Sequence, residues 1–397
     1  MNWKVPLADV QMGQEEIDAV TQVLRSGWLS MGEATQAFER AFAEFLGVKH
    51  AFAVANGTAA LHLAHAALGL AAGAEVIVPS LTFVATANSI VYTGATPVFA
   101  EIGGADDLNV SATDIERRIT PRTRAITVMH YAGYACDMDA ISELARRHQL
   151  QVVEDAAHAV GTVYRGRRAG LFSDAACFSF FANKNMTTGE GGMVVTQRDD
   201  VADRIRLMRS HGMTTLTWDR HKGHAHSYDV VAAGYNYRID EMRSALGLVQ
   251  MQRLEAGNRR RQELVDAYRR ALRDVRGLTV PFSNSLHTSA NYIFPILLDD
   301  ASRRSDLIES LKGQGIQTSI HYPPIHLFSH YRERYGYRPG SLPITEDIGT
   351  RQVTLPLYPA MSDADQADVV AAIRQALAED PPAVRPADGV LRALRDA

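Results

Sequence analysis

The chain contains only two cysteines, Cys136 and Cys177, and their spacing is not that of a metal or disulfide pair. This scarcity argues against a disulfide framework and a cysteine-based zinc site, and it fits a reducing compartment. The longest apolar stretch, AALHLAHAALGLAA, carries His62 and His65 and is too short to span a bilayer. The N-terminal stretch MNWKVPLADVQMG lacks the apolar centre of a signal peptide. We therefore expect a cytoplasmic protein without a membrane partner.

A basic surplus is also lacking. The chain has 41 Lys and Arg residues against 45 Asp and Glu, which gives a formal net charge of -4. Such a balance argues against nucleic acid as a partner, because phosphate backbones are bound by clustered positive charge. The 397 residues, of which 46% are hydrophobic, are sufficient for two or three domains with a large core.

Two amphipathic segments open the chain, and both are expected to be helices that face the core. The apolar residues that share a helical face are Ile17, Val20 and Leu24 in the first and Phe38, Phe42 and Phe45 in the second. From residue 51 the pattern changes to short β-rich runs, most of them separated by helical stretches. These runs are AFAVA, EVIVP, TPVFAEI, AITVMH, QVVED, ACFSFF and MVVT. Such alternation predicts a mainly parallel sheet with helices on both faces, and ligands then bind at the carboxyl ends of the strands.

A second group of elements follows a long, charged helical pattern. It comprises the runs YIFPILL and IQTSIHY and two helices, near 301–314 and 363–378. We expect a large domain over residues 1–250, which includes the N-terminal segment, a smaller α/β domain over 251–380, and a tail over 381–397.

The motif AFAVANGTAALHLA predicts a strand, a turn and a helix, with Asn56, Gly57 and Thr58 at the junction. A helix N-terminus offers unpaired N–H groups and the positive end of a dipole, so it can bind a phosphate. The alternative is an ordinary helix cap, in which Asn56 or Thr58 satisfies the helix's own donors.

The motif VVEDAAHAVG places Glu154 and Asp155 at the end of an apolar strand. A buried carboxylate needs a cationic partner, and a protonated heteroaromatic nitrogen would be one. The alternative is that Asp155 caps a following helix. His158, three residues later, could meet the same ligand or be a structural histidine.

Lys184 lies in FSFFANKNMTTGEGG, between an apolar strand and a glycine-rich turn, five residues after Ser179. A lysine in a dry pocket loses its proton readily and attacks aldehydes. A solvated surface lysine is the alternative. Phe83, after the strand EVIVP, could stack on a flat cofactor or belong to the core. Together these strand ends supply a phosphate cradle, an acid for a ring nitrogen, a stacking ring and an amine, which is the set that pyridoxal phosphate requires.

The motifs NGTAALHLA, EVIVPSLTFVATAN, VVEDAAHAVG, CFSFFANKNMTTGEGGMVVT and GYNYRIDEMRSALGLVQ resemble the DegT/DnrJ/EryC1/StrS family of sugar aminotransferases. The similarity runs in one order from GWLSMGEATQAFERAFAEFLGV to SLPITEDIGTRQVTLPLYP, which is nearly the whole chain. This resemblance implies the aspartate aminotransferase fold (fold type I), with a mainly parallel sheet in a large domain and a smaller C-terminal α/β domain.

The resemblance also implies roles for single residues. Lys184 would carry pyridoxal phosphate as a Schiff base, Asp155 would pair with the ring nitrogen, and Phe83 would contact the ring. The expected contacts to the phosphate are Gly57, Thr58, Ala59 and Ser179, with His158 beside the ring. Asn236 and Arg238, in GYNYR, would reach the active site of a second subunit, which implies a homodimer with composite sites. A packed turn is the alternative for GYNYR.

The implied reaction is transfer of an amino group from L-glutamate to a keto group of a nucleotide-linked deoxysugar. Family members in which histidine replaces the lysine are dehydratases, so Lys184 favours transamination. One alternative is a cyclitol or related ketone as the acceptor, and another is a non-catalytic regulator that binds pyridoxal phosphate. Trp28, Tyr322 and His326 are candidate substrate contacts, and so is His321, with structural packing as the alternative.

A loop near residue 220 carries three histidines, His221, His224 and His226. Their spacing could suggest a metal, but no second ligand cluster accompanies them. We therefore expect no metal and interpret the loop, with Trp218, Arg220 and Lys222, as facing a substrate or a second subunit.

Overall fold

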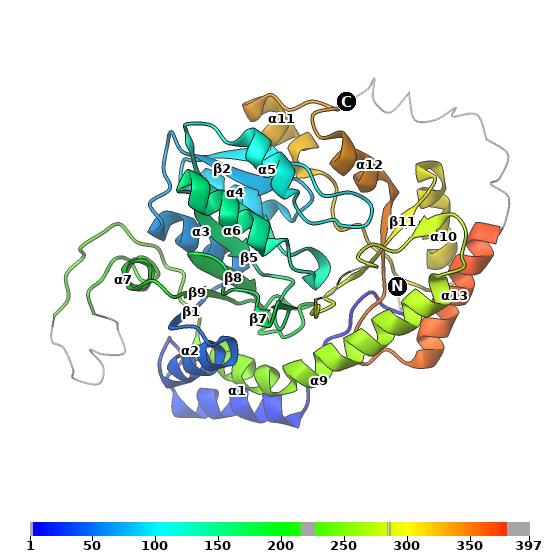
Figure 1. The fold of residues 1–397 in the computed structure, drawn as a ribbon. Helices are drawn as coiled ribbons and strands as arrows, with labels where there is room; N and C mark the ends of the chain where they lie inside the picture. Colours follow the sequence, from blue (N-terminus) through cyan, green and yellow to red (C-terminus); the bar gives the residue numbers. More distant parts are fainter. Residues whose placement is uncertain (1–2, 216–226, 284, 286, 379–397) are drawn as a thin grey trace, which may run out of the picture.

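The structure is a computed structural model in which residues 3–215, 227–283, 285 and 287–378 are described. It consists of a large α/β unit and a smaller one, joined by the long helix α9 (Glu241–Leu272) (Figure 1). The expected fold class is confirmed: a mostly parallel sheet in the large unit and a small sheet in the C-terminal unit.

The seven predicted strands of the large unit are all present and form one sheet, in the order β1-β9-β8-β5-β4-β2-β3. They are β1 (His50–Val54), β2 (Glu75–Pro79), β3 (Thr96–Ala100), β4 (Thr123–Met129), β5 (Gln151–Asp155), β8 (Ala175–Ser179) and β9 (Gly192–Thr196). The strands from β3 to β8 are parallel, and β9 is antiparallel to both β8 and β1. The carboxyl ends of β1, β2, β5 and β8 therefore lie at the same edge.

Helices cover both faces of this sheet, because successive strand residues point to opposite sides. Val153 packs with α3 and α7 on one face, whereas Val152 packs with α6 on the other. The helices on the first face are α3 (Gly57–Ala67), α4 (Val84–Tyr92) and α7 (Asp199–Met208). Those on the second face are α2 (Glu33–Leu46), α5 (Ala112–Arg118) and α6 (Met138–His148). Figure 1 shows α5 and α6 in front of the sheet.

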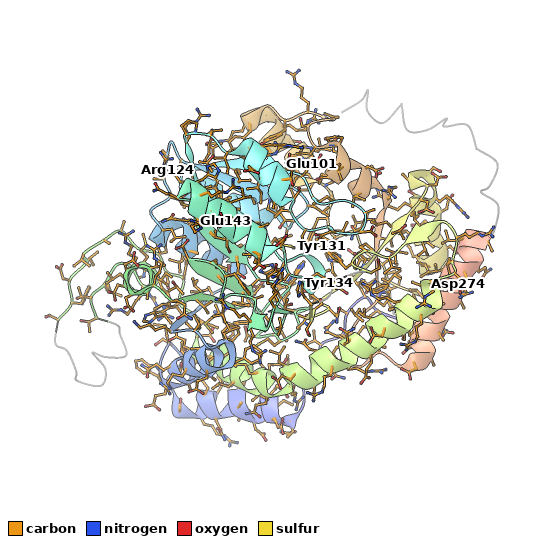
Figure 2. The ribbon with its side chains drawn as sticks, in the orientation of Figure 1. Glu101, Arg124, Tyr131, Tyr134, Glu143 and Asp274 are labelled. Atoms are coloured by element: carbon orange, nitrogen blue, oxygen red, sulfur yellow. The ribbon has the colours of Figure 1, made fainter. Side chains whose placement is uncertain are left out.

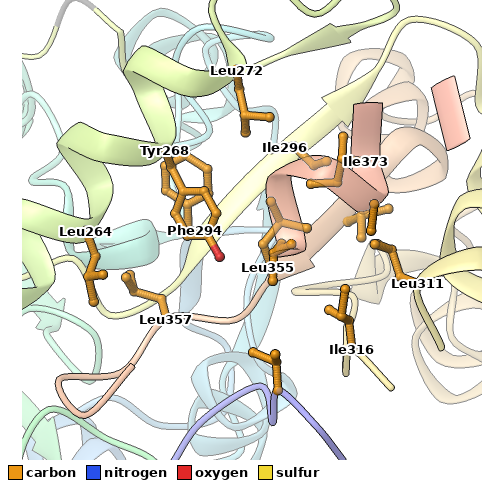
Figure 3. Packing of buried hydrophobic residues seen from close by; sticks show 14 of the residues in the cluster. Leu264, Tyr268, Leu272, Phe294, Ile296, Leu311, Ile316, Leu355, Leu357 and Ile373 are labelled. Carbon is orange, nitrogen blue, oxygen red and sulfur yellow. The ribbon is translucent and has the colours of Figure 1, made fainter. Parts of the chain in front are cut away.

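The smaller unit is built on an antiparallel sheet of β10 (Leu278–Thr279), β11 (Phe294–Leu298) and β12 (Gln352–Leu355). Its helices are η2 (Ala301–Arg303), α10 (Arg304–Gly313), η3 (Ile325–Leu327), α11 (Ser329–Tyr335), α12 (Pro343–Arg351) and α13 (Asp363–Ala378). Tyr268 of α9 stacks on Phe294 of β11, with ring centroids 4.8 Å apart (Figure 3). This core ties the second half of α9 to the smaller unit.

The predicted strand YIFPILL and the helices near 301–314 and 363–378 are confirmed. The prediction of an element at IQTSIHY is wrong. Residues 316–322 form only isolated bridges, from Ile316 to Val5 and from Ser319 to Thr354. The segment is therefore a loop that is fixed by these two bridges, and its residues, including His321, lie between the two units.

Helix α1 (Gln14–Ser26) differs from the expectation that its apolar face is buried. Ile17 and Leu24 are 56% and 55% exposed, although α2 buries Phe38 and Phe42 as predicted. The side of α1 that meets α9 is polar: Glu16 accepts a hydrogen bond from the Gln250 amide at 2.9 Å. Periodicity identified the apolar face of α1, but Ile17 and Leu24 on that face stay more than half exposed to solvent among the described residues.

The predicted limit between the domains, at residue 250, falls inside α9, which continues without a break from Glu241 to Leu272. Its first half packs against α1 and α2, and its second half against α13. The N-terminal segment also departs from the expected division, because Val5 lies in the core of the smaller unit. The predicted tail, 381–397, lies outside the described residues.

The two units are joined by hydrogen bonds near the centre of the molecule. Tyr131 and Tyr134 follow β4 and lie between the sheet and the smaller unit (Figure 2). The Tyr131 hydroxyl donates to the carbonyl of His321 and accepts from the Gln352 amide.

The remaining short elements are η1 (Tyr131–Gly133), β6 (Val163–Tyr164) and β7 (Arg167–Arg168). Among the described helices, none is both long and apolar enough to cross a membrane.

Candidate active site

A cavity of about 380 Å³ opens at the carboxyl edge of the sheet, where β1, β5 and β8 end. Residues of the smaller unit close it from the opposite side. The predicted site residues that line it are Gly57, Thr58, Phe83, Asp155, His158, Ser179, Lys184 and Tyr322. The cavity thus brings together groups that are up to 265 residues apart in the sequence.

The start of α3 forms the wall at the end of β1. Asn56 caps the helix, because its side-chain oxygen accepts the Ala59 N–H at 2.8 Å. This cap satisfies the amide of Ala59, whereas the first-turn N–H groups of Gly57 and Thr58 have no carbonyl within the helix to bond. A Cβ on Gly57 would lie 2.8 Å from the Cβ of Ser179, so only glycine lets β8 approach here. The cap interpretation holds for Asn56, and two amides remain for a phosphate.

Asp155 ends β5 and is 4% exposed. Its carboxylate accepts the Thr86 hydroxyl at 2.7 Å and the Ala157 N–H at 3.1 Å. No helix follows it, so the cap interpretation does not apply. Burial raises the pKa of Asp155, while the two hydrogen bonds and the charge of Lys184 oppose that rise. Within the described residues no cation lies within ion-pair distance of this carboxylate, so a bound cationic group would stabilise it.

Lys184 follows β8 in a loop and points into the same cavity. Burial lowers the pKa of Lys184 to about 7, and the charge of Asp155 only partly opposes this shift. Its Nζ lies 3.9 Å from the centre of the Tyr292 ring. Near neutral pH a large fraction of this amine is therefore uncharged, which is the form that attacks an aldehyde. The solvated-lysine interpretation does not hold.

His158 lies between the large unit and the smaller one. Its ring packs on Tyr292, with centroids 4.2 Å apart, and its Nε2 is 3.0 Å from the Tyr322 hydroxyl. The other ring nitrogen, Nδ1, is buried and has no hydrogen-bond partner within the described residues. Burial, helped by the charge of Lys184, lowers the pKa of His158 well below its usual value, so the ring is neutral. A neutral imidazole with one free nitrogen can bind an oxygen of a ligand.

Two aromatic rings, Phe83 and Phe181, line the cavity while remaining 53% and 45% exposed. The Phe83 ring lies 5.9 Å from that of Tyr322, centre to centre. Phe83 is thus placed to contact a flat ligand in this cavity.

Five predicted residues do not line the cavity. Ala59 is one of them, and its N–H is bonded to the Asn56 side chain. His326 is fully buried elsewhere, with its ring nitrogens bound to Ser80 at 2.6 Å and Glu346 at 3.0 Å, so structural packing explains it. Trp28 follows α1 and packs against Gly32. Asn236 is exposed, and Arg238 donates to the Ser210 hydroxyl at 3.0 Å. These positions leave Asn236 and Arg238 outside the cavity of their own chain.

The structure adds three residues to the candidate site. The sequence motifs did not identify Tyr292 or Cys177 as site residues, and His321 was only one of several candidate substrate contacts. Tyr292 faces Lys184 and donates its hydroxyl hydrogen to Asn183 at 3.0 Å. His321 lines the cavity, with Nδ1 held by Thr354 at 3.0 Å, and burial lowers its pKa to about 4. Cys177 also lines the cavity. Tyr292 gave no signal, because it lies in an apolar run that is typical of a buried strand.

The histidine-rich loop with His221, His224 and His226, together with Trp218, Arg220 and Lys222, lies outside the described residues. Among the residues that are described, no group of three or more His, Cys, Asp or Glu side chains is placed to hold a metal ion.

The groups around the cavity fit pyridoxal phosphate. The free amides of Gly57 and Thr58 and the hydroxyl of Ser179 suit its phosphate, and the buried carboxylate of Asp155 suits its ring nitrogen. The unpartnered Nδ1 of His158 suits its phenolic oxygen. The amine of Lys184 completes the set.

Comparison with known proteins agrees with this geometry. The model of the DegT/DnrJ/EryC1/StrS aminotransferase family matches residues 10–374. The chain belongs to this family. It is also 43% identical, over 94% of its length and 97% of the relative's, to the spore coat polysaccharide biosynthesis protein SpsC of Bacillus subtilis (strain 168).

Two solved structures extend the comparison. Helicobacter pylori PseC, an aminotransferase involved in the biosynthesis of pseudoaminic acid, is 31% identical with a TM-score of 0.88. The match covers 94% of this chain and 99% of PseC. The putative sugar aminotransferase Spr1654 from Streptococcus pneumoniae, solved in a PMP form, is 26% identical with a TM-score of 0.89, over 94% and 99% of the two chains. Spr1654 is also known in a PLP form. The DegT/DnrJ/EryC1/StrS member described here is accordingly a pyridoxal-phosphate-dependent aminotransferase.

Proposed function

We propose that the protein transfers the amino group of L-glutamate to a keto group of a nucleotide-linked deoxysugar. The observation that carries the proposal is the placement of Lys184 and Asp155 around one cavity, where burial lowers the pKa of Lys184 to about 7. SpsC and PseC, whose names refer to polysaccharide and pseudoaminic acid biosynthesis, support a sugar as the acceptor.

Each residue has a distinct task in this proposal. Bound pyridoxal phosphate supplies an electron sink for the bond changes at the substrate carbon. Asp155 would keep the ring nitrogen of the cofactor protonated, because a buried carboxylate stabilises an adjacent positive charge. Lys184, as a free amine, would carry a proton between the substrate carbon and the cofactor. A pKa of about 7 would let it accept and release that proton near neutral pH.

The proposal includes a homodimer. Asn236 and Arg238 lie outside the cavity of their own chain, and Ile17 and Leu24 on the apolar side of α1 are more than half exposed in the part of the chain that the structure describes. A second subunit that buries this side of α1 would remove exposed apolar area, and Arg238 of that subunit could add a cation for the cofactor phosphate.

The function is tested with the purified holoenzyme. L-Glutamate alone should convert the cofactor from its aldehyde to its amine form, and a panel of keto-sugar nucleotides and cyclitol ketones should then reverse the change. Borohydride treatment before glutamate should fix the cofactor on Lys184, as located by mass spectrometry. Reversal by a cyclitol ketone and by no sugar nucleotide would reject the proposed acceptor. No conversion with any amino acid would indicate a regulator instead.

A further inference from the structure

A chain of two buried hydroxyl groups ends at Asp155. The Thr86 hydroxyl lies 2.7 Å from Oδ2 of Asp155, and the Thr82 hydroxyl lies 2.7 Å from that of Thr86. Thr82 is in the loop between β2 and α4, and Thr86 is in the first turn of α4. Both threonines are fully buried, and neither lines the cavity. Their hydroxyls therefore act on the site through the carboxylate of Asp155.

The charge of Asp155 sets the direction of this hydroxyl chain. An ionised carboxylate has no hydrogen to donate, so the single hydrogen of the Thr86 hydroxyl is donated to Asp155. Thr82 must then donate its own hydrogen to Thr86. With the carboxylate ionised, the hydrogen of each hydroxyl thus has an acceptor.

A protonated Asp155 either reverses the chain or weakens it. If the carboxyl group donates to Thr86, then Thr86 donates to Thr82, and the Thr82 hydrogen has no acceptor in the described part of the chain. A buried donor without an acceptor is destabilised, because it has lost its hydrogen bonds to water. If the proton is on the other oxygen, Thr86 donates to a neutral group, which accepts a weaker bond than a carboxylate. The chain therefore favours the ionised form.

This support matters because Asp155 is 4% exposed. Burial raises the pKa of Asp155, and the hydrogen bond from Thr86 is the largest of the effects that oppose the rise. Hydroxyl groups that donate in sequence polarise one another, so the bond from Thr82 strengthens the bond that Thr86 makes. A residue that does not touch the carboxylate can thus influence its charge.

We infer that Thr82 is a positioning residue of the active site, which acts through Thr86 to hold Asp155 in its ionised form. The inference rests on the proposed function, in which this carboxylate pairs with the ring nitrogen of the cofactor. It adds to that function two residues outside the cavity, on the loop and helix that follow β2.

The test measures the titration of Asp155 in the apoenzyme. Protein labelled at the carboxyl carbon of aspartate is followed by NMR as the pH is changed, and the Asp155 signal is identified by its absence in Asp155→Asn. Thr86→Val keeps the size of the side chain and removes the hydroxyl, so the pKa of Asp155 should rise by roughly one to two units. Thr82→Val should raise it by roughly half a unit.

Other ionisable groups also face Asp155, and they remain the same in these variants. They are His130 after β4, Cys177 in β8, Lys184 in the loop after β8 and Tyr322 of the smaller unit. A difference in the titration midpoint between variants therefore reports the hydroxyl chain.

The double variant shows whether Thr82 acts through Thr86. When residue 86 is already valine, Thr82→Val should add no further shift, because the link to the carboxylate is gone. An additive shift, or no shift in Thr82→Val alone, would overturn the inference.

Thr93→Val is the matched control. Thr93 follows the other end of α4, and its hydroxyl donates to the carbonyl of Ile90 at 2.8 Å. The same substitution there should leave the midpoint of Asp155 at its wild-type value. A shift as large as that of Thr82→Val would mean that any hydroxyl lost from this region has the effect, and would reject the inference.

Serine variants test the hydroxyl itself. Thr82→Ser keeps the donor, and its midpoint should stay close to that of the wild type. If circular dichroism shows that Thr86→Val is unfolded, Thr82→Val and Thr82→Ser decide the question, and equal midpoints in these two would reject the inference. The titrations contain no amino donor or acceptor. The expected shifts without any glutamate conversion would therefore reject the proposed reaction and leave the hydroxyl chain standing, and normal conversion without the shifts would do the reverse.

Discussion

Asp155 and Lys184 are the two residues whose charge states decide what the cavity can do. Asp155→Asn keeps a side chain of the same shape, which can still accept the Thr86 hydroxyl now found at 2.7 Å. Cofactor binding should therefore persist, whereas transamination should fall by roughly 10²- to 10⁴-fold, because the ring nitrogen loses its counter-charge. Single-turnover absorbance with L-glutamate measures the effect. Near-normal turnover would reduce Asp155 to a structural role.

Lys184 and Tyr292 give a prediction about pH. The rate at which apoenzyme takes up pyridoxal phosphate should rise with pH through about 7, since only the uncharged amine reacts. The Tyr292 ring, 3.9 Å from Nζ, stabilises the ammonium form. Tyr292→Leu should therefore move the midpoint to lower pH, by roughly half a unit to one unit.

The control for this experiment is Tyr292→Phe, which keeps the ring and loses only the bond to Asn183. Its midpoint should stay close to that of the wild type. A midpoint that moves equally in the Phe and Leu variants would show that the hydroxyl, and not the ring, sets the charge state of Lys184.

Among the elements, α3 has a start whose position beside β8 depends on a single residue, Gly57. Gly57→Ala would place a Cβ 2.8 Å from the Cβ of Ser179, so the helix start or the end of β8 has to move. We expect at least a tenfold loss of affinity for pyridoxal phosphate, measured by absorbance titration, and a lower melting temperature of the apoenzyme, because the close contact also costs stability. Gly13→Ala, at the start of α1, is the comparison. Unchanged affinity in Gly57→Ala would mean that the phosphate does not bind here.

The elements also show what the sequence can predict. The seven strands of the sheet were identified because each is a short β-rich run bounded by turns or helical segments, and Asp155, Lys184 and Gly57 were found because polar residues and glycine stand out at strand ends. The exposure of Leu24 was not predicted, since periodicity shows which residues share a face and not what covers it. Tyr292 was missed because its partners, Lys184 and Asn183, lie more than 100 residues away in the chain.

For the whole molecule, the decisive question is whether each active site uses both subunits of the proposed dimer. Lys184→Ala and Arg238→Ala should each be inactive, the first for lack of the amine and the second for lack of a cation in the partner's site. A mixed dimer would have one site with both changes and one with neither, so random exchange should restore about a quarter of wild-type activity. Activity is assayed after mixing, with exchange followed by a mass tag. Exchange without recovery would place Arg238 in the site of its own subunit.

Two nucleophiles, Lys184 and Cys177, line the cavity that would receive an aldehyde. Removal from water favours the uncharged form of each group. This lowers the pKa of an amine and raises the pKa of a thiol. It lowers the pKa of Lys184 to about 7, whereas it raises the pKa of Cys177 well above its usual value, and the nearby charges of Asp155 and Glu154 add to that rise. At neutral pH the amine is thus available while the thiol stays protonated and inert. The same desolvation therefore makes the site chemoselective, and no thiohemiacetal at Cys177 competes with attachment at the lysine.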